Sequence, residues 1–226
     1  MLLYKYNMRF LSLLKDSVLS FLFPTNREVA RLESLAPHKI LEILPPALVE
    51  DDRNIVALFD YKDPLVRELI WQVKYTGNRT IAEKLGVILY DVICDDLSEQ
   101  TLLGKNGAAI IMPIPISDKR RFERGWNQAE LLTREIKKCD RAKVFKYLPG
   151  QLVKHRHTES QTKTSSRQER LENIKGSMRI LNPAQVQDRC VVLVDDVSTT
   201  GATFNEAKRV LKEAGAKKIL CVAVAH

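Results

Sequence analysis

Apolar and polar residues follow two different rhythms along the chain. Continuous apolar runs predict strands buried on both faces, and they lie at residues 54–61, 108–116, 190–194 and 217–225. Shorter runs predict two further strands, at residues 150–155 and 177–181. Apolar residues spaced i, i+3, i+4, i+7 predict helices, at residues 64–75, 80–97, 127–139 and 202–215. Strands that alternate with helices indicate an α/β fold, with a mostly parallel sheet flanked by helices.

The first part of the chain has a helical pattern that prolines interrupt, at Pro24, Pro37 and the pair Pro45-Pro46. The double proline is followed by charged residues and is the best boundary between two parts of the chain. We therefore expect an N-terminal helical appendage over residues 1–50 and a larger domain over residues 51–226.

The apolar run near the start is broken by Lys15 and Asp16. This favours a helix packed on the main domain over a signal peptide or a helix on a membrane surface. No segment reaches about 18 uninterrupted apolar residues, so we expect no membrane span. The net charge of +8 favours an anionic partner, namely nucleic acid, a phosphorylated small molecule or an acidic membrane surface. A solvated basic surface is the alternative.

The four cysteines are far apart in the sequence and form no C-x-x-C pair; they are Cys94, Cys139, Cys190 and Cys221. Two of them lie in apolar strand-like runs and are interpreted as small buried hydrophobic residues. We therefore predict neither a disulfide nor a structural zinc site, as is typical of a cytoplasmic protein.

The stretch VLVDDVSTTGAT, residues 192–203, joins a predicted central strand to a helix. Parallel sheets bind ligands beyond the carboxyl ends of their strands. There, the N–H groups of the first helical turn and of a tight loop favour a phosphate. The candidate phosphate-binding residues are Ser198, Thr199, Thr200, Gly201, Ala202 and Thr203. A capped helix without a ligand is the alternative interpretation.

Two adjacent carboxylates, Asp195 and Asp196, end the strand just before this loop. Carboxylates can accept hydrogen bonds from the hydroxyls of a ribose or contact Mg²⁺. A phosphate site beside them predicts a ribose 5-phosphate as the ligand.

VVLVDDVSTTGAT resembles the phosphoribosyl-pyrophosphate (PRPP) binding motif of type I phosphoribosyltransferases. Three further stretches, YKDPLVRELIWQVKYTGN, PIPISDKRRFERGWNQAELL and RHTESQTKTSSRQERLENIKGSM, resemble the ComF/GntX family, which is named for a role in DNA uptake. The resemblance covers residues 54–226. It implies a type I phosphoribosyltransferase-like, Rossmann-like fold that binds Mg²⁺-PRPP, with Asp195 and Asp196 as the catalytic and Mg²⁺-associated residues.

Two departures from the family pattern are present. Many members carry a four-cysteine zinc ribbon after the first helix, whereas residues 25–46 contain no cysteine. We therefore expect no zinc. Ser198 stands where the PRPP motif usually has an apolar or aromatic residue.

Basic residues follow the strand 108–116, on the expected ligand side. Arginine matches phosphate oxygens in a two-pronged geometry, and the resemblance implies a pyrophosphate loop with Arg120, Arg124 and Gly125. An exposed charge run is the alternative. We interpret the neighbouring Trp126 as a packing residue rather than a base-stacking one, and Asn127 and Gln128 as residues that open and cap the following helix.

The polar stretch after residue 153 corresponds in the resemblance to the flexible loop that closes over PRPP. Its candidate phosphate contacts are Lys154, Arg156, Arg167 and Arg170. A surface loop without a ligand is the alternative, and the nearby His155 and His157 lack a third metal ligand.

Three functions remain open at this point: a phosphoribosyltransferase acting on a nitrogen acceptor, a non-catalytic PRPP or nucleotide sensor, and a nucleic-acid-binding factor in DNA uptake. The third ranks lower because the basic loops lack interleaved aromatic residues and no helix-turn-helix is evident. Sequence motifs of P-loop ATPases, dinucleotide-binding enzymes, zincins and serine hydrolases are absent. The acceptor cannot be inferred from these residues, and a homodimer remains open.

Overall fold

The computed structural model describes residues 27–48, 55–99, 108–155 and 174–226. Its main sheet has five parallel strands in the order β1-β7-β6-β2-β3. The strands are β1 (Ile55–Phe59), β2 (Ala109–Pro113), β3 (Phe145–Tyr147), β6 (Cys190–Val197) and β7 (Lys218–Ala225). Because β6 lies in the middle of the sheet, its carboxyl end is a natural position for a ligand site.

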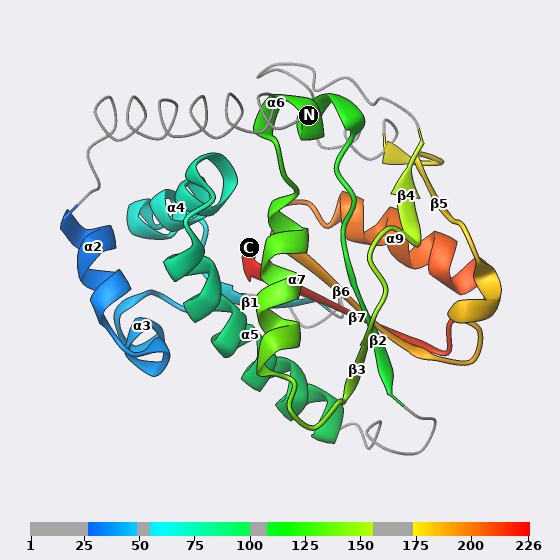
Figure 1. Cartoon of the computed structure of the whole chain (residues 1–226), viewed down its shortest axis with the longest axis horizontal. Coiled ribbons are helices and arrows are strands. Elements are labelled where there is room, and N and C mark those ends of the chain that lie inside the picture. Colours follow the sequence, from blue (N-terminus) through cyan, green and yellow to red (C-terminus); the bar gives the residue numbers. More distant parts are fainter. Residues whose placement is uncertain (1–26, 49–54, 100–107, 156–173) are drawn as a thin grey trace, which may run out of the picture.

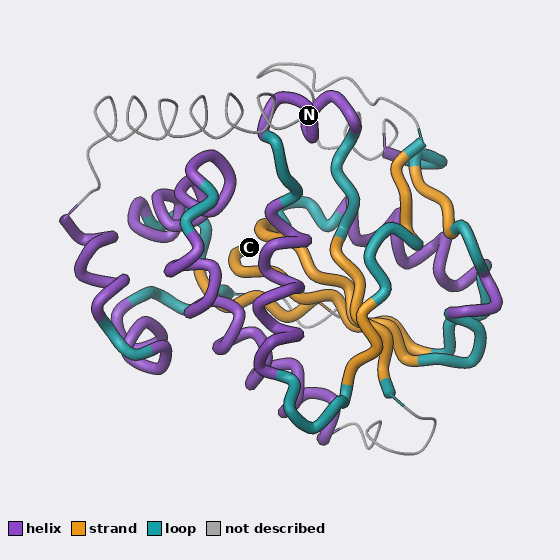
Figure 2. Tube along the Cα trace, viewed as in Figure 1, coloured by secondary structure: helices purple, strands orange, loops and turns teal. Residues whose placement is uncertain are grey.

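Helices cover both faces of this sheet (Figures 1 and 2). One face carries α4 (Pro64–Trp71), α5 (Arg79–Glu99) and α7 (Gln128–Cys139). The other carries α9 (Ala202–Glu213) and a separate antiparallel hairpin of β4 (Leu152–Lys154) and β5 (Met178–Ile180). The predicted α/β fold with a mostly parallel sheet flanked by helices is therefore confirmed.

Strand β6 contributes alternate residues to the two faces. Val192 and Val194 pack in the cluster formed with α4, α5 and α7, whereas Val191 and Leu193 pack in the cluster formed with α9. All four are fully buried. This alternation, which is inherent to a strand, explains why the run is apolar throughout, and it continues into the two aspartates that follow.

The described part of the N-terminal region contains α2 (Arg27–Ser34) and α3 (Pro37–Ile43). Their apolar residues, including Val29 and Ile40, belong to the same buried cluster as α4 and α5. Asn78 Nδ2 donates a hydrogen bond to Glu33 Oε1 at 2.6 Å, which adds a polar contact between the two parts. Helices α2 and α3 thus pack on the sheet domain, while the boundary of the appendage at residue 50 remains a prediction.

Three local features differ from the expected pattern. The basic stretch expected as a loop forms a short helix, α6 (Asp118–Arg124), none of whose residues is buried. The predicted helix 64–75 is α4 followed by a π-helical turn, Gln72–Thr76. The three-residue strand β3 had no predicted counterpart. Among the described residues, no helix combines the length and the apolar character needed to cross a bilayer.

Candidate functional site

Asp195 and Asp196 occupy the carboxyl end of β6 and are both buried. Asp195 borders an open pocket that is otherwise lined by residues 197–204. Asp196 lies on the α7 side, where its Oδ2 is 2.7 Å from Lys74 Nζ and its Oδ1 is 3.4 Å from Gln128 Nε2. Asp196 therefore has a cationic partner and a polar partner inside the protein.

The charge on Asp195 is disfavoured by its surroundings. Burial, followed by the nearby negative charge of Asp196, raises the pKa of the Asp195 carboxyl well above its usual value. The backbone N–H of Asp196 donates to Asp195 Oδ1 at 2.9 Å and, together with the charge of Lys74, acts in the opposite direction. A carboxyl with a raised pKa that faces a pocket is a typical functional-site feature.

The loop 198–203 forms the rest of the pocket wall between β6 and α9. Gly201 is in the left-handed region, with φ 70°, and is the N-terminal cap position of α9. Gly201 has no side chain that could cap the helix, but the neighbouring Thr200 Oγ1 accepts a hydrogen bond from Ala202 N at 3.4 Å. Ser198 is buried with its Oγ unpaired within the described residues, and its backbone N–H donates to Ala225 O at 2.9 Å. The predicted residues from Ser198 to Thr203 are thus brought together around one pocket at a helix N-terminus.

Basic side chains lie on the other side of the acidic pair. Arg124 Nη1 donates to Gln128 Oε1 at 3.1 Å, so Gln128 links Arg124 to Asp196. The guanidinium of Arg124 also lies 5.2 Å from the centre of the Tyr75 ring, in a cation–π contact. Gly125 has φ 85° and ends α6.

Lys154, at the end of β4, is electrostatically coupled to this site. Burial, with an added contribution from the positive charge of Arg120, lowers the pKa of the Lys154 ammonium group, and the charge of Asp195 partly opposes this shift. Lys154 therefore lies within interaction range of both Asp195 and Arg120. Arg156, Arg167 and Arg170 fall outside the described residues.

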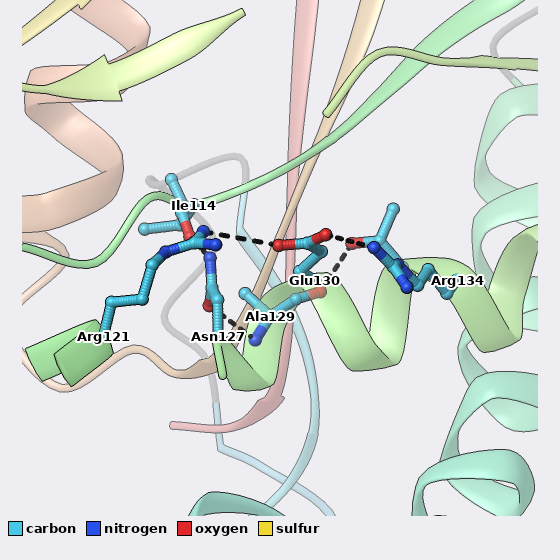
Figure 3. Close-up of polar contacts among 7 residues, drawn as sticks. Ile114, Arg121, Asn127, Ala129, Glu130 and Arg134 are labelled. Atoms are coloured by element: carbon cyan, nitrogen blue, oxygen red, sulfur yellow. Dashed lines mark hydrogen bonds and ion pairs between the residues drawn. The ribbon is translucent and has the colours of Figure 1, made fainter. Parts of the chain in front are cut away.

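The start of α7 is fixed by polar contacts from neighbouring elements (Figure 3). Asn127 Oδ1 accepts from Ala129 N at 3.0 Å, and its Nδ2 donates to Ile114 O at 2.9 Å, just after β2. Glu130 pairs with Arg121 of α6 at 3.4 Å and with Arg134 at 2.6 Å. Asn127 thus caps α7 as predicted, and α6 is tied to α7.

The indole of Trp126 has a packing role, as expected. Its Nε1 donates to Val73 O at 3.1 Å, and its ring lies against Gly77. Lys74 was not identified from the sequence as a residue of the site. Gln128, expected to cap α7 together with Asn127, is instead the first residue of that helix, and its side chain bonds Arg124 and Asp196. Lys74 lies within a stretch that carried the family resemblance, but nothing local to it indicates a contact with Asp196.

The acidic pair fits the coordination that Mg²⁺ usually adopts with phosphorylated substrates, in which one or two carboxylates act together with phosphate oxygens. Asp195 is the better placed of the two because it borders the pocket. Within the four described ranges, no three His, Cys, Asp or Glu side chains gather closely enough to hold a metal ion by themselves. The expected lack of zinc remains a prediction that elemental analysis can test.

Comparison with known proteins identifies the family. Competence protein F of Haemophilus influenzae is 31% identical over 167 residues, which are 74% of this chain and 69% of that protein. The chain belongs to the ComF family. Residues 134–226 match the phosphoribosyl transferase domain family. This match covers β6, the loop 198–203 and α9, and therefore includes both aspartates and the residues that line the pocket.

Other relatives of this ComF protein include the DNA utilization protein YhgH of Escherichia coli K12, which is 30% identical over 74% of this chain and 69% of that protein. Among solved structures, a hypoxanthine phosphoribosyl transferase of Trypanosoma cruzi is 14% identical, covers 63% of both chains and has a TM-score of 0.40.

Proposed function

We propose that this ComF protein binds Mg²⁺-PRPP in the pocket at the end of β6 and transfers the phosphoribosyl group to a nitrogen acceptor. The observation that carries the proposal is the position of Asp195, a buried carboxyl of raised pKa on the same pocket as the loop 198–203. The 5-phosphate would accept hydrogen bonds from the loop N–H groups and from the hydroxyls of Ser198, Thr199, Thr200 and Thr203.

In this proposal the two aspartates have different roles. Asp195 accepts hydrogen bonds from the ribose hydroxyls and contacts Mg²⁺, while Asp196 fixes the surrounding polar groups. Mg²⁺, when bound, neutralises the charge of the pyrophosphate. Arg120, Arg124 and Lys154 supply further positive charge for the same purpose.

The reaction breaks the bond between C1 of the ribose and the pyrophosphate oxygen, and pyrophosphate leaves with the electron pair. A bond forms between C1 and the acceptor nitrogen, which loses a proton. Such a reaction needs no covalent protein nucleophile, because positioning and charge neutralisation supply the catalysis. The names of the relatives place those proteins in competence and DNA utilization, and we extend that setting to this chain.

Isothermal titration calorimetry with PRPP, with and without Mg²⁺, tests the binding step. We expect Mg²⁺-PRPP to bind more tightly than ribose 5-phosphate, and Asp195→Asn to abolish the difference. Lys138→Met, on the far end of α7, is the control. No binding of Mg²⁺-PRPP would refute the proposal.

Release of pyrophosphate in the presence of a panel of nucleobases and other nitrogen compounds tests the transfer step. Binding without release by any acceptor would favour a non-catalytic PRPP sensor. Tight, salt-dependent binding of DNA with no response to PRPP would instead favour a nucleic-acid-binding factor.

A further inference from the structure

Helix α4 does not end as an ordinary α-helix. After Trp71 the chain continues through the π-helical turn Gln72–Thr76, which we call the π-turn, and stops at Gly77 in the left-handed region with φ 66°. Thr76 Oγ1 closes the turn by donating to Gln72 O at 2.7 Å. Such turns are rare in proteins, and those that occur are often located at functional sites. The side chains of this turn are therefore candidates for a functional role.

The π-turn is held in place by the segment that joins α6 to α7. Trp126 Nε1 donates to Val73 O at 3.1 Å, and a Cβ atom at Gly77 would lie only 3.2 Å from the Trp126 ring. The rings of Trp71 and Tyr75 are 5.6 Å apart. The position of the turn is therefore fixed relative to the proposed pyrophosphate loop.

Two successive residues of the π-turn contact the two halves of the proposed site. Lys74 Nζ is 2.7 Å from Asp196 Oδ2, with 20% and 6% of their side chains exposed. Tyr75 packs under the Arg124 guanidinium at 5.2 Å. Gln128 completes the connection by hydrogen bonding to both Arg124 and Asp196. Contacts thus run from Lys74 through Asp196, Gln128 and Arg124 to Tyr75, and the two ends of this series are neighbours in the sequence.

We infer that Lys74 is a positioning residue for the proposed phosphoribosyl transfer, because its ammonium group anchors Asp196 on the α7 side of β6 and leaves Asp195 to face the ligand. The inference rests on the proposed function of this pocket. Lys74 is not among the residues that line the pocket, so it acts through the aspartates. Because Tyr75 is its neighbour, the same turn sets the position of Arg124.

Lys74 is needed because two adjacent buried carboxylates repel each other, which makes their ionised forms energetically unfavourable. Without a cation, one carboxylate of such a pair is driven to take up a proton, and a buried charge that loses its partner is strongly unfavourable. Among the described residues, the titratable groups that influence Asp195 are Asp196, Lys74, Lys154 on β4 and Cys221 on β7. Lys74 is the cation that pairs directly with the acidic strand end.

The test compares Lys74→Met with Lys74→Arg and with a matched control, Lys138→Met. The control breaks a lysine–carboxylate pair of the same length, 2.7 Å, to Glu135, whose side chain is 7% exposed, but at the far end of α7. Binding of Mg²⁺-PRPP and of ribose 5-phosphate is measured by calorimetry. We expect Lys74→Met to weaken binding by about tenfold or more, as the loss of one charge-assisted interaction does.

A comparison of two ligands separates this role from a purely structural one. Because Lys74 acts through the aspartates, Lys74→Met should weaken binding of Mg²⁺-PRPP but leave binding of ribose 5-phosphate, which the loop 198–203 is proposed to hold, close to that of the wild type. Lys74→Arg should restore most of the affinity for Mg²⁺-PRPP, and Lys138→Met should match the wild type. Equal affinity for Mg²⁺-PRPP in Lys74→Met and the wild type would overturn the inference.

A measurement without ligand separates this inference from the proposed function. NMR chemical shifts of the backbone N–H groups of Asp195, Asp196 and the loop 198–203 report the arrangement of the strand end in the free protein, and Lys74→Met should change them even if PRPP does not bind. Shifts that match the wild type, as those of Lys138→Met should, would refute the role of Lys74. If Lys74→Met does not fold, Lys74→Gln, which removes the charge but keeps a hydrogen-bond donor, supplies the same test.

Discussion

Asp195 and Asp196 are neighbours in the sequence, but they serve opposite faces of the sheet. Asp195 borders the pocket next to α9, and Asp196 pairs with Lys74 beside α7. The alternation of side chains along β6 produces this division, since Val191 and Leu193 precede Asp195 on its face and Val192 and Val194 precede Asp196 on the other. Substitutions at the two positions should therefore have different consequences.

Asp195→Asn should stabilise the protein at neutral pH while it lowers the affinity for Mg²⁺-PRPP to that for ribose 5-phosphate. The pKa of Asp195 is raised in the folded state, so its contribution to stability is lost as pH rises from the unfolded value, about 4, through the folded value. Asparagine cannot ionise and avoids this loss. We expect a gain of about 0.5–2 kcal/mol at pH 7, as for other replacements of strained functional residues, and almost none at pH 3. Urea unfolding at several pH values measures it, and a gain independent of pH would contradict the explanation.

Asp196→Asn should have the opposite effect on stability. The substitution leaves the ammonium group of Lys74, only 20% exposed, without its ionic partner. Breaking a fully buried pair costs about 3–5 kcal/mol and an exposed pair contributes less than about 1, so we expect a loss of about 1–3 kcal/mol. Urea unfolding at pH 7 checks this value. A more stable variant would show that Lys74 and Asp196 do not stabilise each other in solution.

The sequence predicted β1, β2, β6 and β7 and the loop 198–203 between β6 and α9, because these depend on local patterns. Apolar runs marked β6 and β7, and the spacing of apolar residues marked α9. Helix α6 was missed because none of its residues is buried, so it has no apolar stripe. The contact between Lys74 and Asp196 joins segments far apart in the chain, and a π-turn leaves no signature in the apolar spacing of α4. Sequence could suggest the ligand side of the site but not the partner of Asp196.

The hairpin β4–β5 should be anchored to α9 by Glu206. This side chain is 3% exposed, pairs with Arg209 at 2.9 Å, and accepts a hydrogen bond from Met178 N at 3.5 Å. Burial alone would raise the pKa of Glu206, but the Arg209 guanidinium and the backbone N–H groups of Met178 and Gly176 outweigh it and lower that pKa. The stability from Glu206 is therefore present above its unfolded pKa and is lost as pH falls through the folded value.

Glu206→Gln should consequently cost about 1–3 kcal/mol at neutral pH, the range for a buried charged hydrogen-bonding group, and less in acid. Glu213→Gln is a matched control, because Glu213 contacts the same Arg209 at 2.6 Å but is 64% exposed. Its cost should stay below about 1 kcal/mol. Hydrogen exchange at Met178 N should increase in Glu206→Gln alone. Equal effects of the two variants would mean that the hairpin is held by other contacts.

The two glycines at the ends of α9 allow strain and ligand binding to be separated. Gly201 before the helix and Gly215 after it both lie in the left-handed region, with φ 70° and 82°. An added Cβ would meet Ile55 at 3.5 Å in the first case and Gln187 at 3.3 Å in the second. Alanine at either position should therefore lower the free energy of unfolding by a similar amount, about 1–2 kcal/mol for the left-handed backbone.

Gly201, however, belongs to the pocket wall, where the backbone must approach the proposed 5-phosphate closely. We expect Gly201→Ala to weaken Mg²⁺-PRPP and ribose 5-phosphate binding by at least about tenfold, one charge-assisted hydrogen bond or more, while Gly215→Ala binds as the wild type does. Urea unfolding and calorimetry on the same two variants measure both quantities. Equal losses of affinity would attribute the effect to destabilised α9, and no loss in either would show that the loop 198–203 does not hold the phosphate.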